Sequence, residues 1–288
     1  MLSVYIQGGL GNQLFQIFAL VSASLEHNIP FKIPYYETTS SGIKRPTYWN
    51  TFFKRLMCYT CSDFFNHKFL KYNESNFNFT KLPVPLHSSN QPVMYCGYFQ
   101  SEKYFKPNFH QISELIGLDE MKSNIMHDIG KTYLKEDYVN ISMHFRLGDY
   151  KSIQQAHPLL NDDYYIKSIN YILSTSEPGG MRANIICFFE EEDINEIIKR
   201  VEHIKSNIKI KDNVSIILCD TIIDDWKQLL LMSLCDHNII ANSTFSWWGA
   251  YFNLNPSKMV IYPSKWFGFV NQNLSTTDLI PEKWIKIM

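Results

Sequence analysis

Short apolar runs alternate with segments of helical periodicity through the second half of this 288-residue chain. The apolar runs have the length of strands and lie at residues 138–145, 183–189, 214–218, 238–241 and 259–263. The segments with helical spacing lie at residues 162–173, 192–205, 224–235 and 245–254. Apolar strands that alternate with helices are typical of a parallel sheet covered on both faces. The sequence therefore predicts an α/β fold for this half.

The first half begins a similar series. A strand is expected at residues 3–7, a helix at 13–27, a short strand at 31–33, a strand at 93–99 and a helix from 101 to 116. Residues 34–92 are rich in aromatic residues, Asn, Ser and Pro and show little periodicity, so short helices and loops are expected there. The α/β series restarts after the polar stretch at 121–137. We therefore predict two domains, at residues 1–135 and 136–288, with the C-terminal tail packing back on the first.

Composition excludes several classes of protein. Apolar residues make up 45% of the chain and aromatic residues 15%, which is enough for a full core. The net charge is −1, so the chain as a whole does not favour nucleic acid or an anionic membrane. Without an apolar run of about 18 residues, we expect no stable membrane insertion. Glycosylation sequons at Asn140 and Asn242 fall within expected core or site segments, which favours a cytoplasmic location.

A glycine-rich turn lies between the first strand and the first helix, in the segment "QGGLGNQ" at residues 7–13. Backbone amides at the start of that helix could face an anion. The amide side chains of Asn12 and Gln13, beside Gly11, favour a binding site. The alternative is a tight strand-to-helix turn without a ligand.

The segment "NISMHFRLGDY", residues 140–150, begins as a strand and ends as a loop. Side chains alternate between the two faces of a strand, so His144 and Arg146 fall on a polar face opposite Met143 and Phe145. The guanidinium of Arg146 matches the geometry of phosphate oxygens. The alternative is an ion pair between Arg146 and Asp149 that only ties the loop.

A third group of polar residues ends the strand at 238–241. Asn242, Ser243 and Thr244 precede a helix expected to begin near Phe245. A phosphate at this point would meet hydroxyl groups and helix-start amides. The alternative is simple capping of the helix by Ser243 or Thr244. The tryptophans of "FSWWGAY" are expected in the core.

Four segments together resemble the signature motifs of the α-1,2-fucosyltransferases, glycosyltransferase family 11. They are "GGLGNQLFQ", "GYFQSEKYF", "HFRLGDY" and "LCDHNIIANSTFSWWGAY", in the order of the family. The resemblance implies a GT-B fold, in which two Rossmann-like domains face each other across a cleft. It implies GDP-L-fucose as donor, bound by the C-terminal domain, and a β-galactoside as acceptor on the N-terminal side. It also implies α-1,2 transfer with inversion at the anomeric carbon.

The resemblance assigns residues to the donor site. Arg146 would hold the pyrophosphate with His144 beside it, and Asn12 would reach the nucleotide from the opposite domain. The remaining expected contacts are Gly11, Gln13, Asn242, Ser243, Thr244 and Phe245. The run "FFEEED" at 188–193 departs from the Phe-Ser-Asp-Asp pattern of many members. Glu190 or Glu191 could accept hydrogen bonds from guanine or ribose, or the run could be a solvated helix start.

Fucosyl transfer requires stabilisation of the GDP leaving group, whose charge grows as the glycosidic bond breaks. Arg146 and helix-start amides could replace a divalent cation, so we expect neither a metal nor a cofactor. Asp149 is the best-placed carboxylate to act as general base, or alternatively to orient Arg146. Alternative functions are protein O-fucosylation and transfer from another GDP-sugar. The non-enzymatic alternative is a sugar-nucleotide-binding or lectin-like protein.

Overall fold

The computed structural model of the chain describes residues 1–288 except 40–43, 63–67, 86–90, 176–181 and 211–212. It divides into two compact units. Unit 1 comprises Met1–Glu120 and Leu274–Pro281, and unit 2 comprises Met121–Asn273 and Glu282–Met288. The described strand pairings of both units are parallel, which confirms the predicted α/β class.

Unit 1 contains a three-stranded sheet of order β1-β5-β4 and a two-stranded sheet of order β2-β3. An isolated parallel bridge between Leu2 and Phe31 connects β1 to the segment just before β2. The strands are β1 (Leu2–Val4), β2 (Ile33–Pro34), β3 (Thr60–Cys61), β4 (Leu70–Asn73) and β5 (Val93–Cys96). The helices are α1 (Leu10–His27), η1 (Lys54–Tyr59), η3 (Glu102–Tyr104), η4 (Lys106–Asn108) and α2 (Phe109–Ile116).

Helix α1 carries much of the core of unit 1. Its side chains from Leu10 to Ala23 are nearly all buried, and Phe18 meets Phe105 edge-on at 5.4 Å between ring centroids. The single helix expected at 101–116 is instead broken into η3, η4 and α2. Pro107 lies in η4, just after the first break at Phe105, and its missing N–H and its ring do not allow a regular helix to continue through this point.

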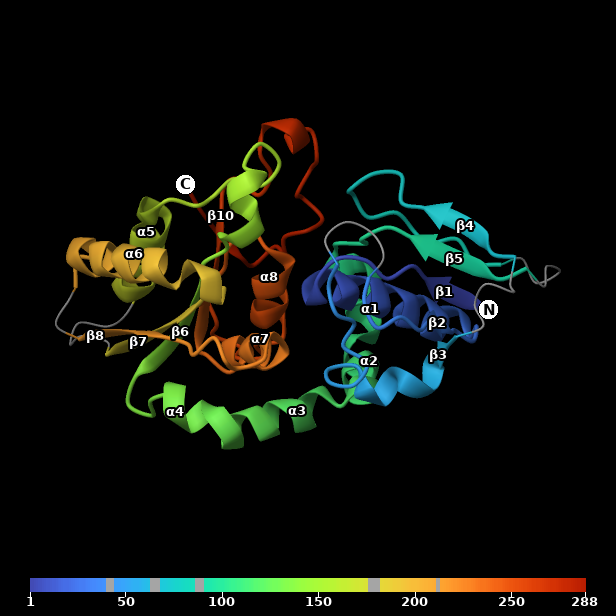
Figure 1. Cartoon of the computed structure of the whole chain (residues 1–288), viewed down its shortest axis with the longest axis horizontal. Coiled ribbons are helices and arrows are strands. Elements are labelled where there is room, and N and C mark those ends of the chain that lie inside the picture. Colours follow the sequence, from blue (N-terminus) through green and yellow to red (C-terminus); the bar gives the residue numbers. More distant parts are fainter. Residues whose placement is uncertain (40–43, 63–67, 86–90, 176–181, 211–212) are drawn as a thin grey trace. The chain divides into compact units, whose positions relative to one another are not determined.

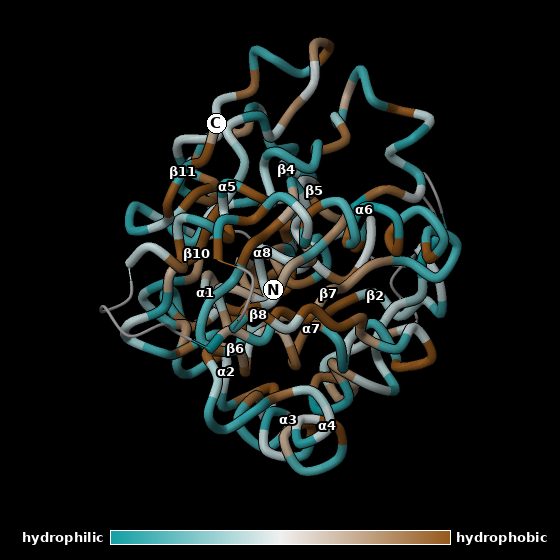
Figure 2. Tube along the Cα trace, turned by 90° about the vertical axis from the view of Figure 1, so that its left-hand side faces the viewer, coloured by the Kyte–Doolittle hydropathy of each residue, from teal (hydrophilic) through white to brown (hydrophobic). Residues whose placement is uncertain are grey.

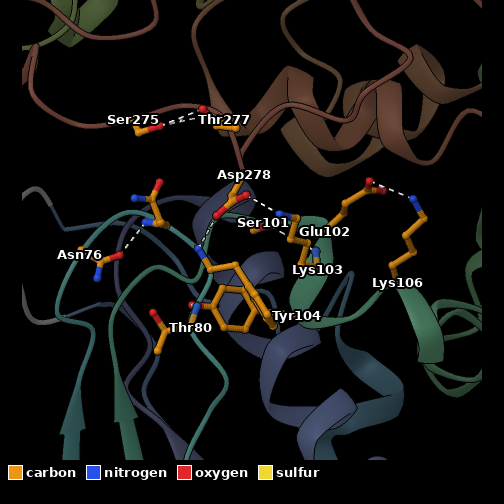
Figure 3. Close-up of polar contacts among 12 residues, drawn as sticks. Asn76, Thr80, Ser101, Glu102, Lys103, Tyr104, Lys106, Ser275, Thr277 and Asp278 are labelled. Atoms are coloured by element: carbon orange, nitrogen blue, oxygen red, sulfur yellow. Dashed lines mark hydrogen bonds and ion pairs between the residues drawn. The ribbon is translucent and has the colours of Figure 1, made fainter.

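The segment Leu274–Pro281 belongs to unit 1 although the chain on either side of it belongs to unit 2. Figure 3 shows how Asp278 holds it. The Asp278 carboxylate accepts a hydrogen bond from the backbone N–H of Phe79 at 2.8 Å and forms an ion pair with Lys103. Lys103 lowers the pKa of Asp278, and Leu279 beside it is fully buried. One charged and one apolar residue thus fix this segment.

Unit 2 contains a six-stranded sheet of order β11-β10-β9-β6-β7-β8 (Figure 1). Counted along the chain, this is the Rossmann order 3-2-1-4-5-6. The strands are β6 (Val139–His144), β7 (Ala183–Phe188), β8 (Val214–Leu218), β9 (His237–Ile239), β10 (Val260–Pro263) and β11 (Ile285–Ile287). The helices are α3 (Leu118–Ile125, which begins in unit 1), η5 (Met126–Gly130), α4 (Lys131–Tyr133), η6 (Gly148–Ser152), α5 (Asp162–Ser174), η7 (Glu191–Asp193), α6 (Ile194–Asn207), α7 (Asp225–Ser233), α8 (Thr244–Tyr251) and η8 (Phe269–Asn271).

Both faces of the second sheet are covered. On one face, Ile141 and Met143 of β6 share a core with α5 and α6. On the other face, Asn238 of β9 donates hydrogen bonds to Ser142 at 2.7 Å and to the Met232 carbonyl of α7 at 2.8 Å. The polar side chains of β6 are therefore buried as well, because helices cover the sheet twice.

Three further features complete the description of the fold. The polar stretch near the expected domain boundary is helical, since α3, η5 and α4 follow one another from Leu118 to Tyr133. Peripheral loops are mostly hydrophilic and the interior strands hydrophobic (Figure 2). Among the described residues, no helix has the length and hydropathy required to cross a membrane.

Candidate active site

Strands β6 and β9 lie side by side at the centre of the unit 2 sheet, where the order of strands reverses. The chain leaves β6 toward β7 and leaves β9 toward β10, so the loops that follow these two strands diverge. In open α/β sheets, ligands bind beyond the carboxyl ends of the strands at such a switch point. The segments that follow β6 and β9 carry most of the expected site residues of this domain, and the other two, Glu190 and Glu191, follow the neighbouring strand β7.

Arg146 follows β6 and is held from three sides. One guanidinium nitrogen, Nη1, forms an ion pair with Glu190. The other, Nη2, donates to Asp149 Oδ1 at 2.5 Å, and the guanidinium carbon lies 5.1 Å from the centroid of the Tyr150 ring. The side chain is 16% exposed. Each terminal nitrogen carries a second N–H, so the clamped guanidinium can still donate to an anion.

The loop after Arg146 depends on Gly148, which has a φ of +31°. The positive φ favours glycine, and a Cβ at this position would lie 2.3 Å from Glu190 Oε2, so the Glu190 carboxylate would have to move away from the loop. The Gly148 N–H donates to Asp193 at 2.8 Å, and Lys151 Nζ donates to the same carboxylate at 2.6 Å. These contacts fix the loop against the segment that follows β7.

Three carboxylates gather at the start of α6: Glu190, Glu192 and Asp193 have oxygen atoms within 4.8 Å of one another. Two of them already have cationic partners, because Arg146 pairs with Glu190 and Lys151 with Asp193. Glu190 thus lies beside the arginine, whereas Glu191 is exposed in η7. Of the two expected nucleoside contacts, the structure brings only Glu190 to the arginine.

His144 is the last residue of β6 and is 5% exposed. Burial, reinforced by the neighbouring positive charge of Arg146, lowers its pKa to about 3. The imidazole is therefore neutral near pH 7 and can act there as a hydrogen-bonding group but not as a cation. Its ring lies 5.6 Å from the ring of Phe245, between centroids, which brings together the segments that follow β6 and β9.

The start of α8 follows β9. Ser243 caps the helix, since its Oγ accepts a hydrogen bond from the Phe245 N–H at 3.3 Å. Asn242 is 1% exposed, and its Nδ2 donates to the carbonyls of Pro158 and Trp266, each at 3.1 Å. Helix-start amides and the positive end of the helix dipole favour an anion at this position, next to Thr244. Capping by Ser243 is confirmed.

The two tryptophans of α8, Trp247 and Trp248, are fully buried, so their expected place in the core is also confirmed. Their indole rings meet at 5.1 Å between centroids. The helix is thus anchored by the two residues at its middle, and its first turn follows the end of β9.

Some of the buried polar atoms without a hydrogen-bond partner lie in the segments around this edge of the sheet. Within the described part of the chain, His144 Nδ1, His157 Nδ1 and Asn242 Oδ1 are buried and have no hydrogen-bond partner. The His157 ring stacks on the Tyr150 ring at 4.8 Å, and Tyr150 donates to the Asn242 carbonyl at 3.1 Å. Buried polar atoms are almost always paired with protein, water or ligand. Such atoms near Arg146 indicate a polar binding site.

Sequence reasoning missed His157 and Tyr150 as members of this group. Tyr150 stood at the end of the quoted motif, and its position four residues after Arg146 was the available signal. His157 had no signal, because it reaches the site only through the fold of the loop.

In unit 1, the expected residues lie in the turn before α1 and in its first turn. Gln13 is fully buried, and its Nε2 donates to the carbonyls of Gly8 at 3.0 Å and Pro46 at 2.8 Å. Both hydrogen bonds of this amide nitrogen are therefore internal to unit 1 and stabilise its fold. Asn12 Oδ1 accepts a hydrogen bond from Gln100 at 2.9 Å. Gly8 has a φ of +77°, and a Cβ there would lie 2.4 Å from Asn12 Nδ2. Gly11 is buried in the first turn of α1.

The chain is similar to known glycosyltransferases. The profile of "Glycosyl transferase family 11" matches residues 1–285. An α-1,2-colitosyltransferase of Escherichia coli is 30% identical over 311 residues, which cover 98% of this chain and 97% of that protein. The O-antigen biosynthesis glycosyltransferase WbnK of Escherichia coli is 32% identical over 200 residues, which cover 67% of this chain and 61% of WbnK.

Two solved structures resemble the chain more distantly. The NodZ α-1,6-fucosyltransferase soaked with GDP-fucose has a TM-score of 0.41 and 9% identity, with 86% of this chain and 91% of that chain covered. The ADP-heptose heptosyltransferase II of E. coli has a TM-score of 0.36 and 12% identity, with 58% and 43% covered.

Proposed function

This chain belongs to glycosyltransferase family 11, and from this premise we propose that it transfers L-fucose from GDP-L-fucose to the 2-hydroxyl of a β-galactoside. The transfer would invert the anomeric carbon and require no metal. The observation that carries the proposal is the position of Arg146 and of the α8 start at the carboxyl ends of two adjacent strands, β6 and β9, where the strand order reverses.

The chemistry of the leaving group supports this assignment. As the bond from fucose to GDP breaks, negative charge grows on the pyrophosphate oxygens. A guanidinium held in place before the reaction stabilises that charge without reorganising, and helix-start amides add to the effect. Arg146 is oriented by Asp149 and Glu190, and α8 is fixed by its buried tryptophans. Both features therefore suit a preorganised anion site.

The neighbouring residues receive roles from their contacts. His144, neutral and buried, would donate or accept a hydrogen bond at the phosphates, because it carries no charge there near pH 7. Asp149 is engaged with Arg146, which supports an orienting role over that of a general base. Glu190 would exchange part of its contact with Arg146 for a hydroxyl or amide of the nucleoside. Asn12 of unit 1 is retained as a donor-site residue on the resemblance.

A second donor is favoured by one comparison. The relative that matches almost the whole chain is named a colitosyltransferase. Colitose is the 3-deoxy form of L-fucose, so the two donors differ by one hydroxyl group. A site that hydrogen-bonds this hydroxyl would discriminate strongly against the deoxy sugar, by about 10⁴-fold or more, whereas a site that only encloses it would discriminate weakly.

The test offers the purified protein GDP-L-fucose and GDP-colitose separately, each with a β-galactosyl disaccharide. Products are quantified by mass spectrometry, and the linkage and anomeric configuration are determined by NMR. We expect an α-1,2-linked product and a higher kcat/KM with GDP-L-fucose. A preference for GDP-colitose would make that sugar nucleotide the proposed donor, and a different linkage would overturn the acceptor assignment.

The remaining alternatives are tested with the same preparation. A peptide that carries Ser and Thr replaces the disaccharide in one reaction, and the acceptor is omitted in another. Transfer to the peptide in place of the galactoside would indicate a protein O-fucosyltransferase. Calorimetric binding of GDP and of the galactoside without transfer or hydrolysis would indicate a sugar-nucleotide-binding or lectin-like protein.

A further inference from the structure

Tyr150 lies under the guanidinium of Arg146. The distance from the guanidinium carbon to the centroid of the phenol ring is 5.1 Å, within the range of a cation–π contact. The same ring stacks on the imidazole of His157, at 4.8 Å and an interplanar angle of 26°. His157 in turn lies 5.9 Å from the ring of Phe267. Tyr150 is therefore supported by its neighbours and cannot turn away freely.

The hydroxyl group of Tyr150 connects the segments that follow the two central strands. It donates a hydrogen bond to the backbone carbonyl of Asn242 at 3.1 Å. Asn242 immediately precedes Ser243, the residue that caps α8. Burial raises the pKa of Tyr150 to about 12, so the hydroxyl keeps its proton and remains a donor near neutral pH. One side chain thus contacts both anion-binding features: the arginine lies over its ring and hydrogen-bonds its hydroxyl oxygen, and the same hydroxyl donates to the residue before the helix start.

We propose that Tyr150 is a positioning residue that holds the Arg146 guanidinium and the start of α8 in register for the pyrophosphate of the donor. The inference rests on the proposed function, because it assumes that Arg146 and α8 act on one anion. It assigns Tyr150 no contact with the reacting atoms. The ring would restrict the guanidinium to one orientation, and the hydroxyl would restrict the spacing between the two loops.

The two parts of the side chain are separable by substitution. Tyr150→Phe keeps the ring beneath Arg146 and removes the hydroxyl, whereas Tyr150→Leu removes both. We expect Tyr150→Leu to lower kcat roughly tenfold to thirtyfold, because a loosely held arginine stabilises the leaving group less well. We expect an intermediate loss of kcat in Tyr150→Phe, because the ring stays beneath Arg146 while the hydroxyl contacts with Arg146 and the Asn242 carbonyl are lost. The KM for the acceptor should remain within about twofold in both variants, since neither change reaches the acceptor.

The chain offers a matched control in Tyr164. Its hydroxyl lies within hydrogen-bond distance of the backbone carbonyls of Ile240 at 2.6 Å and Ile261 at 3.1 Å, and its side chain is buried, whereas Tyr150 is partly buried. Ile240 lies two residues before Asn242 at the same end of β9. Tyr164→Phe therefore removes a comparable hydrogen bond from the same sheet edge without touching Arg146. It should lower Tm and leave kcat and both KM values unchanged.

A double-mutant cycle with Arg146→Lys gives the decisive readout. If Tyr150 acts through the fork of Arg146, the effects of Tyr150→Leu and Arg146→Lys on kcat should not add. The double variant should then be within about threefold of Arg146→Lys alone. Additive losses, or equal impairment by Tyr150→Phe and Tyr150→Leu, would overturn the proposal. Unchanged kcat in Tyr150→Leu would overturn it as well.

The dissociation constant of GDP, measured by calorimetry on the same proteins, separates this inference from the proposed function. If the wild-type protein binds GDP but does not transfer fucose or colitose, the proposed reaction fails and the cycle is run on GDP affinity instead. Weaker GDP binding by Tyr150→Leu, non-additive with Arg146→Lys, still supports the positioning role. Wild-type GDP affinity in Tyr150→Leu, beside weakened binding in Arg146→Lys, refutes it and leaves the role of Arg146 intact.

Discussion

Replacing Arg146 with lysine keeps the positive charge and removes the planar fork. In the structure, one terminal nitrogen of Arg146 binds Glu190 and the other binds Asp149. A lysine offers a single nitrogen, which cannot hold both carboxylates and also direct two N–H groups at phosphate oxygens. Arg146→Lys should therefore lose stabilisation of the leaving group even though the charge remains.

The magnitude follows from the lost contacts. One charge-assisted hydrogen bond contributes about 1.5–3 kcal/mol when a buried partner is left behind. If one such bond to the leaving group is lost in the transition state, kcat should fall by roughly tenfold to a hundredfold or slightly more. Because the charge on GDP grows during the reaction, the loss should fall on kcat and not only on the KM of the donor. Stopped-time assays at saturating GDP-L-fucose measure it.

The melting temperature alone does not decide the role of Arg146, since the lysine variant also loosens two carboxylates. The control is Arg200→Lys. Arg200 is 13% exposed, binds Asp162 at 2.6 Å and lies 5.2 Å from the ring centroid of Phe145, so its surroundings resemble those of Arg146. The Arg200→Lys substitution should lower Tm without changing kcat. If Arg146→Lys behaves like Arg200→Lys, with normal kcat and reduced Tm, Arg146 only ties its loop and the reasoning is refuted.

Three further predictions follow from the site. Transfer should continue in EDTA, because Arg146 and the α8 start would perform the role of a cation; activity lost in chelator and restored by Mg²⁺ or Mn²⁺ would contradict this. Asn12→Ala should reduce turnover while Tm falls only slightly, since Gln100 loses one hydrogen bond, worth about 1 kcal/mol. An unchanged rate would show that the glycine-rich turn has only a structural role. Because the pKa of His144 is lowered in the folded protein, the imidazole binds a proton in the unfolded chain at a higher pH than in the folded one. The free energy of unfolding should therefore fall by up to about 2 kcal/mol as the pH is lowered from 6.5 to 5. Urea denaturation at both pH values measures this loss, and His144→Asn should flatten the dependence; an equal slope in both proteins would show that His144 does not contribute.

Hydrophobic periodicity in the sequence predicts most of unit 2 correctly. The apolar runs at 183–189 and 214–218 form β7 and β8 with almost the expected bounds. Such runs are informative because strands buried on both faces are mostly apolar. Strands β3 and β4 of unit 1 escaped this reasoning. They are two and four residues long, and most of β4 is exposed, so neither leaves an apolar pattern.

The helix expected at 101–116 shows a different limit. Apolar spacing continues through it, but Pro107 breaks the hydrogen-bond ladder, and three short helices replace one. The proline was visible in the sequence, and its local effect outweighed the periodicity. The polar stretch at 121–137 shows the converse, because it lacks an apolar run and is still helical along much of its length.

The sequence by itself determined which residues end the strands and what chemistry they carry, namely His144 and Arg146 after β6 and Asn242–Phe245 after β9. Tertiary structure decided their partners. Strand β6 pairs with β7 in a register that sets His144 beside Phe188, and two residues further along each chain this register brings Arg146 to Glu190. The reason is physical: sheet register and loop closure are set by packing across the whole unit, between segments that are distant in the sequence, and no local pattern encodes them.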